Sequence, residues 1–266
     1  MAFNIIVCAK QVPDTNVIKI NPKTGTLIRD GVPSILNPDD ANALELALQI
    51  KDKYKDVTVT VVSMGPPQAK DLLMECIAMG ADRGVLISDR AVGGSDTWAT
   101  SNAIEATIKK VGHFDLILAG RQAIDGDTAQ VGPQIAEKLN LPQVTYVEEF
   151  EMSDDMKEIT VHRQLEDGYE LIKIKTPCML TCIKELNTPR YMTIPGIFGA
   201  KDKPMDIWNA KDVNVDLATV GLEASPTNVY RSFTPAPKGK GVTVSGDTDN
   251  EVAKNLLIAL KGKHAI

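Results

Sequence analysis

Four short runs of apolar residues recur along the first half of the chain, at residues 3–9, 57–63, 84–88 and 114–119. Valine, isoleucine and leucine dominate these runs, and such nearly continuous hydrophobicity predicts strands that are buried on both faces. Apolar residues at helical spacing follow each run, within residues 44–48, 72–77, 104–111 and 131–139. This alternation predicts an α/β fold, with an open, mostly parallel sheet and helices on both faces.

Three further strand-like runs follow Pro142, at residues 143–151, 157–165 and 169–175. Polar turn signals around Ser153 and Asp167 separate them, which predicts an antiparallel hairpin addition. A buried run at residues 178–183 is expected to return to the sheet. We therefore expect one α/β domain over residues 1–185, with the hairpin as an extension.

From Asn187 to Lys240 the chain is rich in proline, lysine and polar residues and has no convincing apolar core of its own. Such a segment predicts a loop or arm that lies over another surface. Helical spacing returns between Thr248 and Lys261, where Thr248 or Asp249 is expected to cap a C-terminal helix. Two interpretations stay open: the arm and its helix dock on a partner, or they fold back onto their own sheet.

The charge balance, 29 Lys+Arg against 35 Asp+Glu, includes no long run of one sign and disfavours nucleic acid as a partner. The 4 cysteines and 3 histidines are scattered. Cys178 and Cys182 lie in a strand-like run, so we expect reduced core cysteines and no metal site. The chain has no signal-peptide pattern and no apolar stretch near the roughly 20 residues that span a bilayer, so we expect a cytoplasmic protein without a membrane span.

In open α/β sheets ligands bind beyond the carboxyl ends of the strands, so the strand-to-helix turns are the places to search for a site. The turn from Asp125 to Gly132 precedes Pro133, which fits a helix only near its first turn. Free backbone N–H groups at such a helix start attract phosphate. The side chains and glycines expected to assist are those of Arg121, Gly126, Thr128, Gln130 and Gly132.

Three other turns are candidates for the same site: residues 34–40 with Asn37 aimed at a base or sugar, residues 63–67 closing over an adenine, and residues 91–97 as a second lip. Each turn also has a simpler explanation, since Asp127 and Thr128 would merely cap a helix and the others merely redirect the chain. Convergence of the turns at one sheet edge is the stronger argument for a nucleotide site. The G-x-G-x-x-G, G-x-x-x-x-G-K-[ST] and G-x-S-x-G motifs are missing, which disfavours a self-contained dehydrogenase, kinase or hydrolase.

Four parts of the chain carry a specific pattern: residues 7–15, Asn37-Pro38 ahead of residues 43–45, residues 78–83 and residues 120–127. They strongly resemble the β subunit of electron transfer flavoproteins, and matches run from residue 5 to beyond Pro195. The resemblance implies an adenine-nucleotide-binding, Rossmann-like fold. It also implies a heterodimer with an α subunit that holds one FAD, while the β subunit holds AMP or, in electron-bifurcating members, a second FAD.

Residue by residue, the resemblance implies a cofactor site in this chain. The implied residues are Cys8, Asn37, Pro38, Asp39, Asp40, Met64, Arg121, Gln122, Ala123, Ile124, Asp125, Gly126, Asp127, Thr128, Ala129, Gln130, Val131 and Gly132. The segment 187–195, which includes Tyr191, resembles the loop that recognises partner dehydrogenases, with Ile194 where the family places a leucine anchor. Residues 186–266 are therefore expected to hold this loop and a C-terminal arm whose helix docks on the α subunit.

Two features resemble the electron-bifurcating branch: the sequence of residues 125–132 and the presence of residues 93–97, which include Gly94 and Thr97. They favour FAD over AMP. The resemblance then implies NADH as electron donor, ferredoxin or flavodoxin as one acceptor and a flavin-dependent dehydrogenase as the other, with the chemistry carried by FAD and by no catalytic side chain. The alternative is a subunit that binds structural AMP and supports the α-subunit FAD. The sequence leaves open whether the dehydrogenase acts on an acyl-CoA, an enoyl-CoA or a 2-hydroxy acid such as lactate.

Overall fold

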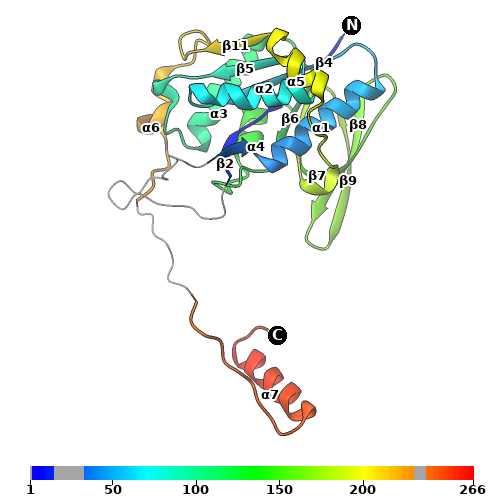
Figure 1. Ribbon diagram of the computed structural model, residues 1–266, viewed down its shortest axis with the longest axis vertical. Helices are drawn as coiled ribbons and strands as arrows, with labels where there is room; N and C mark the ends of the chain where they lie inside the picture. Colours follow the sequence, from blue (N-terminus) through cyan, green and yellow to red (C-terminus); the bar gives the residue numbers. More distant parts are fainter. Residues whose placement is uncertain (1, 15–32, 231–237) are drawn as a thin grey trace. The chain divides into compact units, whose positions relative to one another are not determined.

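The computed structural model describes residues 2–14, 33–230 and 238–266 (Figure 1). The chain divides into two units: the described residues up to Tyr230 belong to the first, and residues 238–266 belong to the second. Residue 15 of the family-like segment 7–15, and residues 231–237 of the expected arm, lie outside the described residues. Each unit is taken by itself below.

Within the described residues, nine strands form the main sheet of the first unit, in the order β11-β5-β4-β1-β6-β10-β7-β8-β9. Their bounds are β1 Phe3–Cys8, β4 Val57–Met64, β5 Arg83–Ile87, β6 Leu116–Gly120, β7 Gln143–Met152, β8 Glu158–Leu165, β9 Gly168–Lys175, β10 Cys178–Cys182 and β11 Met205–Trp208. Neighbours from β11 to β7 pair in parallel, whereas β7, β8 and β9 pair antiparallel. The predicted mostly parallel sheet with an added hairpin is confirmed.

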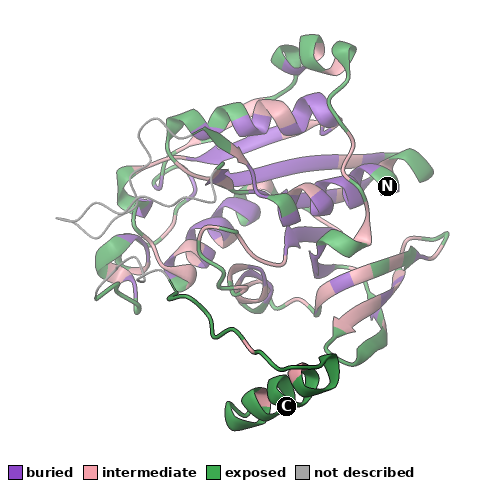
Figure 2. Ribbon diagram, turned by 60° about the horizontal axis from the view of Figure 1, so that its bottom comes forward, coloured by how far each residue is buried: buried purple, intermediate pink, exposed green. Residues whose placement is uncertain are grey.

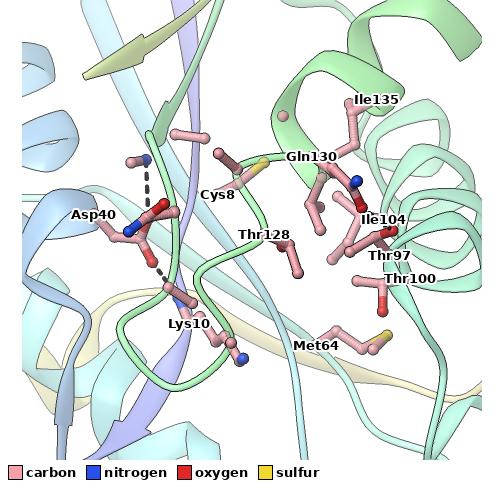
Figure 3. A pocket seen from close by; sticks show the side chains of 18 of the residues that line it. Cys8, Lys10, Asp40, Met64, Thr97, Thr100, Ile104, Thr128, Gln130 and Ile135 are labelled. Carbon is pink, nitrogen blue, oxygen red and sulfur yellow. Dashed lines mark hydrogen bonds between the residues drawn. The ribbon is translucent and has the colours of Figure 1, made fainter. Parts of the chain in front are cut away.

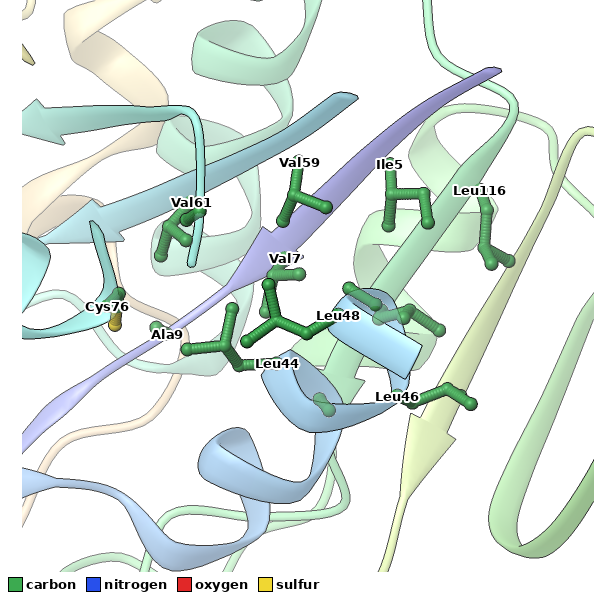
Figure 4. Close-up of a cluster of buried hydrophobic side chains, with 14 of the residues drawn as sticks. Ile5, Val7, Ala9, Leu44, Leu46, Leu48, Val59, Val61, Cys76 and Leu116 are labelled. Carbon is green, nitrogen blue, oxygen red and sulfur yellow. The ribbon is translucent and has the colours of Figure 1, made fainter. Parts of the chain in front are cut away.

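Helices cover both faces of this sheet. The helices α1 (Pro38–Lys53) and α2 (Lys70–Met79) pack on one face, and α3 (Thr97–Val111) and α4 (Val131–Lys138) pack on the other. Side chains alternate along β1, because Ile5 and Val7 join the first core and Ile6 joins the second. In Figure 4, Leu44 and Leu48 of α1 lie against Val7, and Figure 2 shows the central strands buried along their length.

The cysteines of the central strands are core side chains, as predicted. Cys178 and Cys182 share one face of β10, and both are buried with free thiols. Cys76 of α2 is buried in the same core, whereas Cys8 at the end of β1 is partly exposed. Although part of Cys8 reaches the surface, the protein atoms packed around its thiol raise the thiol pKa to about 12, so Cys8 stays protonated at neutral pH.

Residues 186–230 depart from the prediction of a coreless arm. The strand β11 pairs in parallel with β5 at the edge of the main sheet, and the buried side chains of Ala210, Val213 and Val220 pack in the second core. The expected end of the α/β layer at residue 185 is therefore too early. The reason is that β11 has only four residues and carries Asp206 among its apolar ones, which is too short a pattern for a strand to be recognised.

The remaining elements of the first unit are short. They are β2 (Gln11–Pro13) paired antiparallel with β3 (Ser34–Leu36), α5 (Ile194–Gly199), α6 (Gly221–Ala224), and the 3-10 turns η1 (Pro67–Ala69), η2 (Arg90–Val92), η3 (Lys184–Leu186), η4 (Ala200–Asp202) and η5 (Leu217–Thr219). Of these, α5 packs against α2 and thereby continues the layer of helices on that face.

The second unit contains one helix, α7 (Asp249–Gly262), among its described residues. Thr248 caps it, because its side chain accepts a hydrogen bond from the backbone N–H of Glu251, as the capping pattern predicted. Leu256, Leu257 and Ile258 are about half exposed, so α7 keeps an uncovered apolar surface within residues 238–266. Across the described parts of the chain, every helix is too short or too polar to cross a membrane.

Candidate functional site

A cavity of about 370 Å³ lies where β1, β4 and β6 end, at their carboxyl termini (Figure 3). It is lined by residues from segments 8–10, 62–64, 95–104 and 119–135, together with Asp40 and Thr227. The turns singled out in the sequence therefore meet at one edge of the sheet. This arrangement follows from the parallel topology, because adjacent parallel strands deliver their following loops to the same side.

The loop of residues 125–132 forms one wall of the cavity and leads into α4. Pro133 lies in the first turn of that helix, as predicted, and Asp127 and Ala129 adopt positive φ angles of 48° and 51°. The residue before the helix, Gln130, makes no side-chain capping bond. Capping of α4 by Asp127 or Thr128 is therefore wrong as an explanation of this sequence.

The backbone of this loop offers donors instead. Among the described residues, no acceptor takes a hydrogen bond from the backbone N–H groups of residues 128–132. These groups lie at the start of a helix, where the helix dipole adds a partial positive charge. Consecutive free N–H groups in such a turn form a concave site for an anion, and phosphate is the usual occupant.

The helix α3 adds a second positive helix start beside the first. Its first residue, Thr97, donates a hydrogen bond from Oγ1 to Oε1 of Gln130 at 2.8 Å. Asp96 caps α3 through its bond from the N–H of Ala99 at 3.0 Å. The beginnings of α3 and α4 are thus tied together at the cavity wall, with Thr97 and Gln130 both lining it (Figure 3).

The chain just before the end of the first unit completes this wall. The backbone N–H of Thr227 donates to the Asp96 carboxylate at 2.9 Å, and the Ser225 hydroxyl accepts from the N–H of Asp96 at 2.9 Å. Gly94 permits the turn ahead of α3 at a positive φ of 73°, and a Cβ there would lie 3.2 Å from Leu222. Asp96 therefore joins α3 to a segment more than a hundred residues later.

At the other side of the cavity, Asn37 holds a loop. Its side-chain amide donates to the carbonyl of Gln122 at 2.8 Å, and its Oδ1 accepts from the N–H of Ile124 at 3.1 Å. Asn37 is fully buried and does not line the cavity. Its amide thus fixes residues 122–124, instead of facing a base or sugar as the sequence suggested.

Asp40 joins two strand ends to the start of α1. Its carboxylate accepts the backbone N–H of Lys10, just after β1, at 2.8 Å, and the N–H of Gly120, the end of β6, at 2.9 Å. Burial raises the pKa of Asp40 to about 7, although both hydrogen bonds act to lower it. Gly120 has to be glycine, because a Cβ there would lie 2.6 Å from the backbone of Asp40.

Two ion pairs lie on either side of the Asp40 hydrogen bonds. The Lys10 ammonium lies 2.6 Å from the carboxylate of Asp125, and Lys10 also lines the cavity. Arg121 Nε lies 3.4 Å from Oδ2 of Asp39, and its guanidinium lies over the ring of Tyr146 at 5.6 Å. Burial raises the pKa of Asp39, and Arg121 opposes that shift. The acids next to the cavity are therefore each matched by a donor or a cation.

Comparison with known proteins decides what family this site belongs to. The family model described as the electron transfer flavoprotein domain matches residues 24–213. Subunit CarD of the caffeyl-CoA reductase-Etf complex of Acetobacterium woodii is 61% identical over 99% of this chain and 100% of the relative. The electron transfer flavoprotein subunit beta of Clostridium acetobutylicum is 56% identical over 99% and 100%.

The chain belongs to the electron transfer flavoprotein β-subunit family. A further relative that matches over its full length is the acryloyl-CoA reductase electron transfer subunit gamma of Anaerotignum propionicum, which is 51% identical over 99% of this chain and 100% of the relative. The sequence-based recognition of the family and of the α/β fold is confirmed.

This electron transfer flavoprotein subunit brings most of the expected cofactor residues to the cavity. Those that line it are Cys8, Asp40, Met64, Thr97, Arg121, Gln122, Ala123, Gly126, Thr128, Ala129, Gln130, Val131 and Gly132. Those beside it, outside the lining, are Asn37, Pro38, Asp39, Gly94, Ile124, Asp125 and Asp127. The second group holds the loops in place, as the bonds of Asn37 and Asp125 illustrate.

Sequence reasoning missed several residues of the cavity wall. Lys10 had a signal, since it directly follows the first strand, and Ile104 and Ile135 follow from the inward faces of α3 and α4. Thr227 had none, because it lies in a polar, proline-containing stretch without periodicity. The expected partner-binding residues lie outside the cavity, with Tyr191 94% and Ile194 72% exposed.

The raised pKa of Asp40 predicts a pH dependence of folding. Between pH 4 and 7 the folded chain binds a proton at Asp40 that the unfolded chain releases. The free energy of unfolding is therefore highest below about pH 4, where Asp40 is protonated in both states, and it falls as pH rises through 7. Asp40→Asn mimics the protonated acid and cannot ionise. In urea unfolding from pH 4 to 8, wild type should lose on the order of a few kcal/mol relative to the variant. If the free energy of unfolding of wild type and of Asp40→Asn changed with pH in parallel, the raised pKa of Asp40 would be contradicted.

Proposed function

We propose that the cavity holds FAD and that this chain is the β subunit of a heterodimeric, electron-bifurcating electron transfer flavoprotein. The observation that carries the proposal is the pair of helix starts, of α3 and α4, tied by the bond between Thr97 and Gln130 at the cavity wall. Two adjacent positive helix ends suit two linked phosphates. FAD carries a diphosphate, whereas AMP carries one phosphate.

The residues of the cavity divide by the part of the cofactor that each would hold. The backbone N–H groups of residues 128–132 and the Lys10 ammonium would bind the phosphates. Val62, Met64 and Ile104 provide an apolar wall for a flat ring system. The chain thus supplies binding and orientation.

The bound FAD would supply the redox chemistry, by accepting electrons in a pair and releasing them singly. We propose NADH as the donor, ferredoxin or flavodoxin as one acceptor, and a flavin-dependent dehydrogenase, reached through the α-subunit FAD, as the other. Two relatives support a reductase as partner, since their names place them in complexes with caffeyl-CoA reductase and acryloyl-CoA reductase. No side chain of this chain needs to act as acid or base.

Two surfaces are proposed for the protein partners. The segment of residues 187–199, which we call the recognition segment, would contact the dehydrogenase through exposed apolar side chains such as Tyr191 and Ile194. The arm that carries α7 would dock on the α subunit, because the half-exposed Leu256 and Leu257 lack cover within residues 238–266. We place the complex in the cytoplasm.

A second candidate function is supported by the size of the cavity. At about 370 Å³ it lies near the lower end of the roughly 300–1,000 Å³ typical of small-molecule sites, which also suits a mononucleotide. In that case the chain binds structural AMP and supports the α-subunit FAD without handling electrons.

The decisive experiment is to purify the heterodimer and count the cofactors released by acid. Two FAD and no AMP per heterodimer are expected. The β-site FAD should also be reduced by NADH, which absorbance of the oxidised flavin measures. One FAD with one AMP would overturn the proposal in favour of the second candidate.

Gly126 offers a clean test of the site, because a Cβ there meets no atom within 4 Å while the residue lines the cavity. Gly126→Val should fill space meant for the ligand and lower nucleotide content at least about tenfold, which corresponds to about 1.4 kcal/mol of binding free energy. Gly132 is less suitable, since a Cβ would lie 2.7 Å from Thr181 and disturb the fold. Gly239→Val is the matched control, because it too has open space. Retention of full nucleotide by Gly126→Val contradicts the placement.

Ile194→Asp tests the recognition segment. A carboxylate at this exposed apolar position should be left poorly solvated in the complex, so the KM for the dehydrogenase should rise about tenfold or more. Cofactor content should not change, because Ile194 lies outside the cavity lining. Leu217→Asp, at a similarly exposed leucine of η5, is the control. A loss of cofactor in the Ile194 variant would instead show that the segment supports the fold.

A further inference from the structure

The recognition segment is exposed where it would meet a partner and firmly held where it meets its own fold. The side chains of Tyr191, Ile194 and Phe198 are 94%, 72% and 70% exposed. Such apolar side chains on an exposed segment bind weakly if the segment has to be ordered first, because that ordering costs entropy. The contacts that order the segment in advance therefore matter for recognition.

Arg190 makes the most extensive of these contacts, and it reaches a nearly buried acid. Glu45 lies on the middle of α1, and its side chain is only 6% exposed. Its Oε2 accepts from the Arg190 backbone N–H at 3.0 Å and from Nε at 2.8 Å, and its Oε1 accepts from Nη2 at 3.0 Å. Arg190 Nη2 also donates to Asp52, near the C-terminal end of α1, at 2.8 Å.

The geometry of this contact fixes both the backbone and the side chain of Arg190. A guanidinium that donates to both oxygens of one carboxylate has a defined plane, and charge-assisted bonds of this kind are stronger than neutral ones. With Arg190 in place the Glu45 side chain is only 6% exposed, so Arg190 supplies the hydrogen bonds that solvent does not. The pair is therefore a stronger restraint than an ordinary surface ion pair.

Two further contacts hold the segment, one on each side of Arg190. Asn187 and Asn42 of α1 exchange bonds, with each side-chain amide donating to the backbone carbonyl of the other at 2.7 and 3.0 Å. On the far side, Thr193 caps α5, and Gly196 packs directly on the carbonyl of Ala78 at the end of α2. The segment is thus attached to α1 before Tyr191 and to α2 between Ile194 and Phe198.

We propose that Arg190 is a positioning residue for partner recognition: its pair with Glu45 holds the recognition segment in the conformation that the dehydrogenase binds. The inference rests on the proposed contact between this segment and the dehydrogenase. Arg190 itself, with its side chain turned to Glu45 and Asp52, need not touch the partner. Its contribution is that the partner meets a segment that is already ordered.

The test compares heterodimers of wild type, Arg190→Met, Arg190→Lys and the matched control Arg83→Met. Arg83 pairs with Asp206 at 2.7 Å between β5 and β11, and its side chain is 31% exposed against 32% for Arg190, so the control removes an arginine of matching exposure and its ion pair elsewhere in the fold. Caffeyl-CoA reductase of Acetobacterium woodii is the probe, because the Etf subunit of that complex is 61% identical to this chain.

Two readouts are measured. Hydrogen exchange of the Ile197 amide, which is bonded to the Thr193 carbonyl, should accelerate at least tenfold in Arg190→Met and not in Arg83→Met. The KM for the reductase should rise about tenfold in Arg190→Met, while kcat at saturating reductase, reduction of a dye and cofactor content stay at wild-type values. Arg190→Lys, which keeps the charge without the paired bonds, should restore part of the KM.

The outcomes separate this inference from the function on which it rests. Unchanged exchange at Ile197 in Arg190→Met overturns the positioning role, whichever reductase is used. If Ile194→Asp raises the KM and Arg190→Met does not, the inference fails and the proposed contact stands. If Ile194→Asp leaves the KM unchanged, the proposed contact fails, even where exchange shows that Arg190 orders the segment.

Discussion

The buried carboxylate of Asp40 is the constraint on which the candidate site depends. It binds the backbone N–H groups of Lys10 and Gly120, so the start of α1 is fixed against the ends of two adjacent parallel strands. Asn37, one turn earlier, fixes residues 122–124 of the loop that follows β6. Asp40 uses both carboxylate oxygens, and Asn37 uses its amide N–H and its Oδ1, to satisfy backbone groups at or just beyond the ends of these parallel strands.

Because α1 makes these bonds, it supports two surfaces at once. Its first turn positions the floor of the cavity, whereas Asn42, Glu45 and Asp52 further along hold the recognition segment. The apolar face of the same helix packs in the core through Leu44 and Leu48, both buried. A helix so used on several faces cannot show a simple amphipathic pattern, and indeed ten of its sixteen residues, polar ones included, are buried.

The sequence was informative where a pattern is local and long. The central strands read as continuous apolar runs because helices cover both faces, and the turn at residues 125–132 was located by Pro133 and by the strand before it. It was uninformative where the partner is distant. Asn37 bonds to residues 85 and 87 positions away, and Thr227 reaches Asp96 from a stretch without periodicity. The edge strand β11 failed for another reason, since four residues are too few to show a period.

The proposed anion site has acids around it, and the structure shows what offsets the charge of three of them. Asp125 is paired with Lys10, Asp39 lies beside Arg121, and Asp40 has a pKa raised by burial to about 7 and gives both oxygens to backbone donors. Their negative charge is thereby neutralised or screened close to its source. The start of α3 is capped by the Asp96 carboxylate, whereas the N–H groups of residues 128–132 at the start of α4 have no such compensation, so the start of α4 then contributes most to the positive field in the cavity. A net acidic chain can in this way present a cavity that favours phosphate.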